Sequence, residues 1–167
     1  MVSDKRKGKL TMEKIIYFDM DGTIADLYNV KNWLEDLRSY NPRPYAEAAP
    51  MWNMARLSLI LEAMKLSGWT IGVITWLSKD STREYDKLVR EAKREWLRAH
   101  GLLHVMDEIH MVKYGTPKHT TANLRHGVLV DDNQAVREAW ENYGGNTIDP
   151  TVVDLCDYLE NLWEEMD

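Results

Sequence analysis

The sequence has little cysteine, no long apolar run and no excess of basic residues. A single cysteine, Cys156, occurs among 167 residues, which excludes an internal disulfide and a cysteine-rich zinc site. Its valine and leucine neighbours indicate a buried, inert thiol. No apolar stretch approaches the ~20 residues that a membrane span requires, so we expect no membrane partner. Because nothing indicates secretion, these features favour a cytoplasmic protein.

The chain is mildly acidic. Lysine and arginine total 21 against 27 aspartate and glutamate residues, which gives a net charge of −6. Such a chain is not built as a general polyanion binder. Residues 1–13 carry basic side chains but no apolar core, which predicts a flexible tail rather than a signal peptide. Residues 14–167 are long enough for one domain with a sizeable core.

Strand and helix patterns alternate along residues 14–167, which predicts an α/β protein with a parallel sheet covered on both faces. The expected strands are 14–19, 70–75, 108–112, 127–131 and 146–149. The expected helices are 51–66, the segment between Asp80 and Gly101, 135–143 and 151–166.

Basic and acidic residues are mixed on the helix between Asp80 and Gly101. The basic set consists of Lys87, Arg90, Lys93, Arg94 and Arg98. Mixed charges at helical spacing are typical of a solvated surface with i,i+4 pairs. We therefore expect all of these side chains to be solvated.

Residues 26–50 interrupt the alternation directly after the first strand. A short helix is expected over about 30–40, followed by the sequence Asn41-Pro42-Arg43-Pro44-Tyr45. Two prolines two positions apart favour a stiff connection rather than a continued helix. This segment is placed to lean over whatever binds at the end of the first strand.

Polar side chains stand at the ends of three predicted strands. Asp19 and Asp21 close the first strand, Thr75 closes the second, and Asp131 and Asp132 close the fourth. Because the carboxyl ends of parallel strands meet at one edge of a sheet, these groups should converge. Converging carboxylates need a cation, and Mg²⁺ prefers carboxylate and carbonyl oxygens. A lysine in the connection before the fourth strand, Lys118, would neutralise both the acids and an anionic substrate.

The order of these motifs resembles that of the haloacid dehalogenase (HAD) superfamily of phosphotransferases. Its four signatures have counterparts here in Asp19–Thr23, Thr75, Lys118 and the pair Asp131-Asp132. The resemblance covers about residues 14–145. It implies a three-layer, Rossmann-like α/β fold with a small helical cap, here residues 26–50, inserted after the first strand.

The resemblance also implies a phosphatase that works through an aspartyl-phosphate. Asp19 would be the nucleophile, and Asp21 would protonate the leaving oxygen and then activate water. Mg²⁺ would be held by Asp19, the backbone carbonyl of Asp21 and Asp131, with Asp132 and Thr23 in supporting contacts. The phosphoryl group would be bound by Thr75, Lys118, Met20, Gly22 and Trp76.

The substrate is less well determined. Residues 18–26 and the Asp131-Asp132 pair look most like the 5′(3′)-deoxyribonucleotidase branch, which implies a (deoxy)nucleoside monophosphate. The alternative is the 3′-phosphatase domain of polynucleotide kinase-phosphatases, which acts on nucleic-acid ends. The acidic net charge argues mildly against that alternative, because counterion release rewards basic grooves. A catalytically idle HAD-like binding module is a third reading.

Aromatic residues in the inserted segment are candidates for stacking on a base. The candidate substrate contacts there are Tyr28, Trp33, Tyr45 and, for an anionic group, Arg43. Each of the aromatics also fits a role in packing the segment against the body. Both a monomer and a homodimer are compatible with the sequence.

Overall fold

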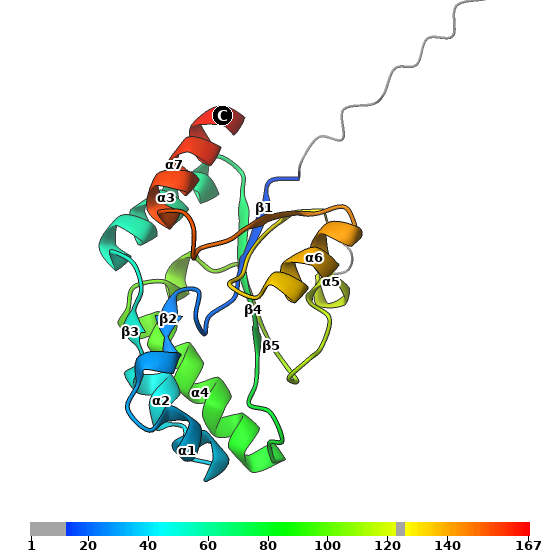
Figure 1. The fold of residues 1–167 in the computed structure, drawn as a ribbon. Helices are drawn as coiled ribbons and strands as arrows, with labels where there is room; N and C mark the ends of the chain where they lie inside the picture. The colour runs from blue at the N-terminus through cyan, green and yellow to red at the C-terminus, as the bar shows by residue number, and fades with distance from the viewer. Residues whose placement is uncertain (1–12, 123–125) are drawn as a thin grey trace, which may run out of the picture.

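The computed structural model describes residues 13–122 and 126–167, so the predicted N-terminal tail lies almost wholly outside the described residues. The described chain is an α/β protein built on a five-stranded sheet in the order β5-β4-β1-β6-β7 (Figure 1). The strands are β1 (Ile15–Phe18), β4 (Thr70–Trp76), β5 (Glu108–Val112), β6 (Val128–Val130) and β7 (Asn146–Ile148). All four pairings are parallel. The predicted strands are therefore confirmed, with ends that differ by at most one residue.

Helices cover both faces of the sheet, as predicted. The helices outside the inserted segment are α3 (Met54–Leu66), α4 (Arg83–Ala99), α5 (Lys118–Thr121), α6 (Gln134–Asn142) and α7 (Leu155–Met166). Four of them are preceded by an N-cap residue whose side chain accepts a hydrogen bond from a backbone N–H of the first turn. These residues are Asn53, Thr82, Asn133 and Asp154. Such caps satisfy donors that the helix itself leaves unpaired.

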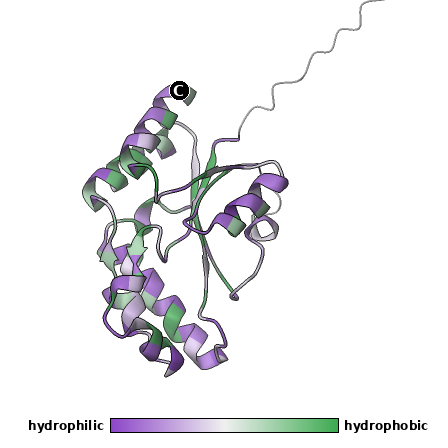
Figure 2. Ribbon diagram, viewed as in Figure 1, coloured by the Kyte–Doolittle hydropathy of each residue, from purple (hydrophilic) through white to green (hydrophobic). Residues whose placement is uncertain are grey.

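The central strand β1 is apolar on both sides because both sides are buried. Ile16 and Phe18 belong to the core formed with α3, α4 and α7. Ile15 and Tyr17 pack in a second core with Trp140 of α6. In Figure 2 the sheet is mostly apolar, whereas the outer helices carry polar residues. Cys156 is buried, as its neighbours predict.

The segment after β1 is more ordered than the sequence indicates. It contains α1 (Trp33–Arg38) and α2 (Arg43–Glu47), and a short antiparallel pair, β2 (Ala25–Asp26) and β3 (Ala49–Pro50), joins its two ends. The first helix is not continued through the prolines, as expected, since α1 ends at Arg38, but the prolines start a second helix, α2, where the sequence predicts a connection. Pro42 is the residue before α2 and Pro44 lies in its first turn, where a missing N–H costs no hydrogen bond.

This helical segment packs against α4 (Figure 1). The Tyr85 hydroxyl donates to the Asn41 carbonyl at 2.9 Å, and the Trp96 indole donates to the Ala48 carbonyl at 2.7 Å. Buried side chains therefore fix α2 beside the body of the protein. Among the described residues, no helix combines the length and the apolar character that crossing a membrane would require.

Candidate active site

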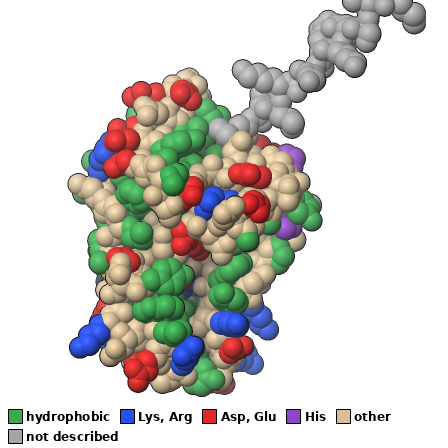
Figure 3. Space-filling view, viewed as in Figure 1, with side chains coloured by type: hydrophobic (Ala, Val, Ile, Leu, Met, Phe, Trp, Pro, Cys, Tyr) green, Lys and Arg blue, Asp and Glu red, His purple; other side chains and the backbone are tan. Residues whose placement is uncertain are grey.

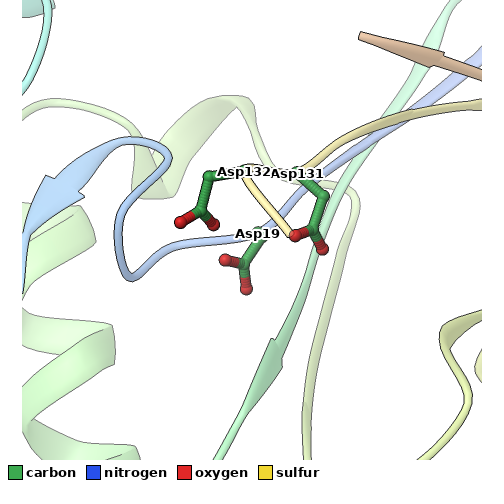
Figure 4. Close-up of side chains that lie close together, drawn as sticks. All are labelled: Asp19, Asp131 and Asp132. Carbon is green, nitrogen blue, oxygen red and sulfur yellow. The ribbon is translucent and has the colours of Figure 1, made fainter. Parts of the chain in front are cut away.

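Three aspartates meet at the carboxyl edge of the sheet. Asp19 follows β1 directly, and Asp131 and Asp132 follow β6, the strand that pairs with β1. One carboxylate oxygen from each residue lies within 4.8 Å of the other two (Figure 4). The convergence expected from the strand order is therefore present. Asp132 is a full member of the cluster, although the sequence suggests only a supporting contact.

A buried lysine bridges two of these acids. The Nζ atom of Lys118, at the start of α5, lies 2.8 Å from Asp19 Oδ1 and 2.6 Å from Asp131 Oδ2. Burial alone would lower the pKa of this ammonium, but Asp19 and Asp131 together raise it. Lys118 is therefore charged in the folded protein.

The single ammonium of Lys118 does not neutralise the charge of the three carboxylates. Burial and the neighbouring Asp19 raise the pKa of Asp131 to about 6, against the opposing effect of Lys118. The same two causes raise the pKa of Asp132. Three carboxylates against one ammonium leave two negative charges in a largely desolvated site. Their number and their hard oxygen donors fit a divalent cation such as Mg²⁺.

Gly22 allows the two acidic loops to approach each other. Its φ is +80°, and a Cβ atom at this position would lie 2.5 Å from Asp132 Oδ2. The hydroxyl of Thr23 donates to Asp132 Oδ1 at 3.3 Å and accepts from the Asp132 backbone N–H at 3.2 Å. The Met20 carbonyl accepts bonds from the backbone N–H groups of residues 23, 24 and 25, which closes the turn. These residues shape the loop that positions the acids.

Asp21 points to a different cation, Lys93 of α4. Lys93 Nζ lies 2.6 Å from Asp21 Oδ2, 2.7 Å from Thr75 Oγ1 and 2.9 Å from the Trp76 carbonyl oxygen. Burial raises the pKa of Asp21, Lys93 opposes that shift, and Asp19 adds to it. Because an ammonium can only donate, Thr75 accepts this bond and keeps its own hydroxyl hydrogen for another acceptor.

The expectation that Lys93 is solvated is wrong, since the residue is 1% exposed. The signal was present in the sequence. Lys93 follows Tyr85 and Val89 at intervals of four residues, and Trp96 and Leu97 continue the same buried stripe of α4. Its place on that stripe, rather than its charge, decides its burial.

A cavity of about 500 Å³ opens above the acids, between the helical segment and the ends of β4 and β6. Its lining combines the acids and Lys118 with aromatic side chains: Tyr28, Trp33, Tyr40, Tyr45, Trp76 and Tyr114. Two aromatic pairs contribute, with ring centroids 5.1 Å apart for Tyr28 and Trp33 and 5.0 Å apart for Trp76 and Tyr114. In Figure 3, hydrophobic side chains flank a recess with acidic side chains at one end.

The cavity contains most of the side chains that the sequence singles out, but not all of them. Of the described residues predicted to serve the site, Met20, Gly22, Thr23, Thr75 and Arg43 lie outside the lining. Met20, Gly22 and Thr23 lie in the loop that carries Asp19 and Asp21, and Thr75 lies in β4. Arg43 is engaged elsewhere: its guanidinium binds Asp36, Glu47 and the Lys31 carbonyl. Its position does not support the predicted substrate contact.

Comparisons of the sequence with protein-family models and with curated proteins give no match. Function must therefore be inferred from the residues of the site itself.

Proposed function

We propose that this protein is a Mg²⁺-dependent phosphomonoesterase of the HAD superfamily, with residues 26–50 as its cap. One observation carries the proposal: Asp19, Asp131 and Asp132 converge around Lys118 at the carboxyl edge of a parallel sheet. Open α/β folds bind their ligands at this edge. The motif order in the sequence supports the same assignment.

The metal would be held by Asp19, Asp131 and Asp132, together with the backbone carbonyl of Asp21 that the superfamily resemblance implies. When bound, Mg²⁺ supplies charge that offsets the repulsion between a carboxylate and a phosphate. The donor set fits this ion, because all of its members are oxygens and the cluster has two uncompensated negative charges.

In the first half-reaction, Asp19 is the nucleophile. Lys118 binds Asp19 Oδ1 at 2.8 Å, whereas Oδ2 has only a long contact of 3.5 Å with the Thr23 hydroxyl, so we assign Oδ2 as the attacking oxygen. The bond from Oδ2 to phosphorus forms as the bond from phosphorus to the ester oxygen breaks, and Asp21 gives its proton to the departing alcohol. The ammonium of Lys118 stabilises the negative charge that spreads over the phosphoryl oxygens.

In the second half-reaction, the aspartyl-phosphate on Asp19 is hydrolysed. Asp21, now a carboxylate, takes a proton from a water molecule as that water attacks phosphorus. The phosphorus–Oδ2 bond breaks, phosphate leaves, and both aspartates return to their starting forms. The presence of Asp21 and Asp19 in the lining of one cavity supports these two roles.

The cavity supports a nucleoside monophosphate as the substrate. Its volume falls within the range of about 300–1,000 Å³ that small-molecule sites occupy. Aromatic rings such as Tyr28 and Trp76 offer planar surfaces to a base, and the acids and Lys118 mark the position of the phosphate. Stacking of this kind contributes about 1–3 kcal/mol per base.

The proposal is tested by measuring phosphate release by the full-length chain with Mg²⁺. The panel contains nucleoside monophosphates, sugar phosphates and oligonucleotides with a 3′-phosphate. We expect fastest release from a nucleoside monophosphate, and a loss of at least about a thousandfold in Asp19→Asn, since removal of a nucleophile has effects of this size. Asp157→Asn is the matched control, because Asp157 lies on α7, away from the cavity lining and the acidic cluster.

Each other outcome has a defined meaning. Faster release from 3′-phosphorylated oligonucleotides would assign the protein to nucleic-acid ends instead. A folded wild-type protein without Mg²⁺-dependent turnover on any ester in the panel would refute the enzyme and favour a binding module.

A further inference from the structure

We propose that Lys93 is a positioning residue that holds the carboxyl group of Asp21 in the orientation needed for proton transfer. The inference rests on the proposed phosphatase function and adds a residue to it. Lys93 contributes no atom to the cavity lining, so its effect passes through Asp21.

The ammonium of Lys93 is fixed on three sides. An ammonium has three donors, and here they bind Asp21 Oδ2, Thr75 Oγ1 and the Trp76 carbonyl. Two of these partners belong to the last residues of β4. Lys93 is thus anchored to a central strand of the sheet and presents its third hydrogen bond to Asp21.

This contact selects one oxygen of Asp21. Because Oδ2 is bound to Lys93 at 2.6 Å, Oδ1 is the oxygen available to a substrate in the cavity that Asp21 lines. A loop carboxylate without such a partner would turn freely about its side-chain bonds. Proton transfer requires hydrogen-bond distance to the reacting oxygen, so a fixed rotamer favours it.

The inserted segment also contacts the ammonium of Lys93, through Tyr45. Lys93 Nζ lies 4.9 Å from the ring centroid of Tyr45 on α2, a distance at which a cation and an aromatic face attract each other. The hydroxyl of Tyr45 is hydrogen-bonded to Ser78, which follows β4. The ammonium therefore joins α4, the end of β4, Asp21 and the segment that covers the cavity.

Stability alone does not explain a lysine at this position. Burying an ammonium and a carboxylate has a desolvation cost that an apolar side chain of similar volume avoids, and such replacements are often neutral or stabilising. An apolar residue would fill the space between α4 and β4. It would not provide a directed donor for Asp21.

The rates for two esters with different leaving groups distinguish a role of Lys93 in positioning the acid from a general structural effect of its loss. Release of an alkoxide needs a proton, whereas p-nitrophenolate leaves without one. We would compare single-turnover release of the leaving group from p-nitrophenyl phosphate with release from the alkyl phosphate that the wild type hydrolyses fastest. The variants are Lys93→Met and, as the matched control on the exposed side of the same helix, Lys87→Met.

We expect Lys93→Met to slow the alkyl ester by about 10–100-fold, within the range for loss of general acid catalysis, and p-nitrophenyl phosphate by about threefold or less. Lys87→Met should match the wild type on both esters. If Lys93→Met does not fold, as judged by circular dichroism, Lys93→Gln serves for the same comparison.

Equal losses on the two esters, or a loss below threefold on the alkyl ester, would overturn the role of Lys93. An inactive wild type would instead refute the phosphatase function itself, so the two failures are distinguishable.

Discussion

A Cβ atom on Gly22 would lie 2.5 Å from Oδ2 of Asp132, although these two residues belong to different loops. The added Cβ atom would also lie 2.8 Å from the Tyr28 ring, so Gly22→Ala must displace either the loop after β1 or both the Asp132 carboxylate and that ring. We expect weaker Mg²⁺ binding together with a loss of stability of more than about 1 kcal/mol, the cost of left-handed backbone alone. Urea unfolding and titration with Mg²⁺ measure the two effects.

Gly101→Ala is the matched control for this prediction. Gly101 has a similar φ of +72°, but no atom lies within 4 Å of a Cβ built there. It should show the backbone cost without the change in Mg²⁺ affinity. Equal Mg²⁺ affinity in both variants and the wild type would contradict the placement of Asp132 at the metal.

The raised pKa of Asp131 predicts how Mg²⁺ binding depends on pH. Its pKa is raised to about 6, so the carboxylate takes up a proton as the pH falls through that value. Mg²⁺ competes with this proton, and its affinity should fall by up to about tenfold per pH unit below pH 6. Calorimetric titration at about pH 5, 6 and 7.5 measures the effect. An affinity unchanged across this range would exclude Asp131 as a ligand.

The same shift predicts the pH dependence of stability in the absence of metal. The carboxyl group of Asp131 binds its proton more tightly in the folded protein than in the unfolded chain, where its pKa is near 3.8. The free energy of unfolding should therefore fall as the pH rises between these two pKa values. In Asp131→Asn this part of the pH dependence should disappear, which urea unfolding in the presence of a chelator would show.

The sequence is sufficient to predict the sheet, because apolar β-branched strands alternate with amphipathic helices along the chain. It also predicts where Asp19 and Asp131 meet, since parallel strands place their carboxyl ends at one edge. The burial of Lys93 is not predicted, because its charged neighbours on α4 indicate a solvated surface although the residue lies on the buried stripe. The partner that makes its burial possible, Asp21, is 72 residues away, and such a contact has no local sequence signal.

The inserted segment is predicted less well for a similar reason. The pairing of β2 with β3 joins the two ends of the segment, and Arg43 meets Asp36 because α2 folds back beside α1. Aromatic residues there could either pack or bind, and the sequence does not separate the two roles. Both Tyr45 and Tyr28 line the cavity, but Tyr45 is buried and hydrogen-bonded to Ser78, whereas Tyr28 is half exposed.

Lys118→Met should make the protein depend on Mg²⁺ for its stability. Removal of the ammonium leaves Asp19 and Asp131 in close contact without a cation, and breaking a buried pair costs about 3–5 kcal/mol. Added Mg²⁺ should recover part of this loss. Thermal unfolding with and without Mg²⁺ measures this recovery of stability. Lys113→Met, at an exposed position, is the control. A Mg²⁺ effect no larger than in the wild type would contradict the prediction.

Tyr114→Ala should weaken nucleotide binding without affecting the chemistry. Tyr114 is half exposed, lines the cavity and packs against Trp76. Loss of one stacking surface should raise KM for a nucleoside monophosphate by about 5–150-fold, equivalent to about 1–3 kcal/mol, and leave KM for a small phosphate ester unchanged. Tyr158→Ala, on the distant helix α7, is the control. A parallel increase in KM for both esters would argue against base stacking.

The most direct test of the proposed chemistry is to detect the phosphoryl group on the protein. Wild-type protein is mixed with Mg²⁺ and its best phosphate ester, quenched with acid during turnover, and digested for mass spectrometry. We predict a phosphoryl group on Asp19, and none in the Asp19→Asn variant treated in the same way. Turnover with no modification of Asp19, or with the phosphoryl group on another residue, would contradict the account.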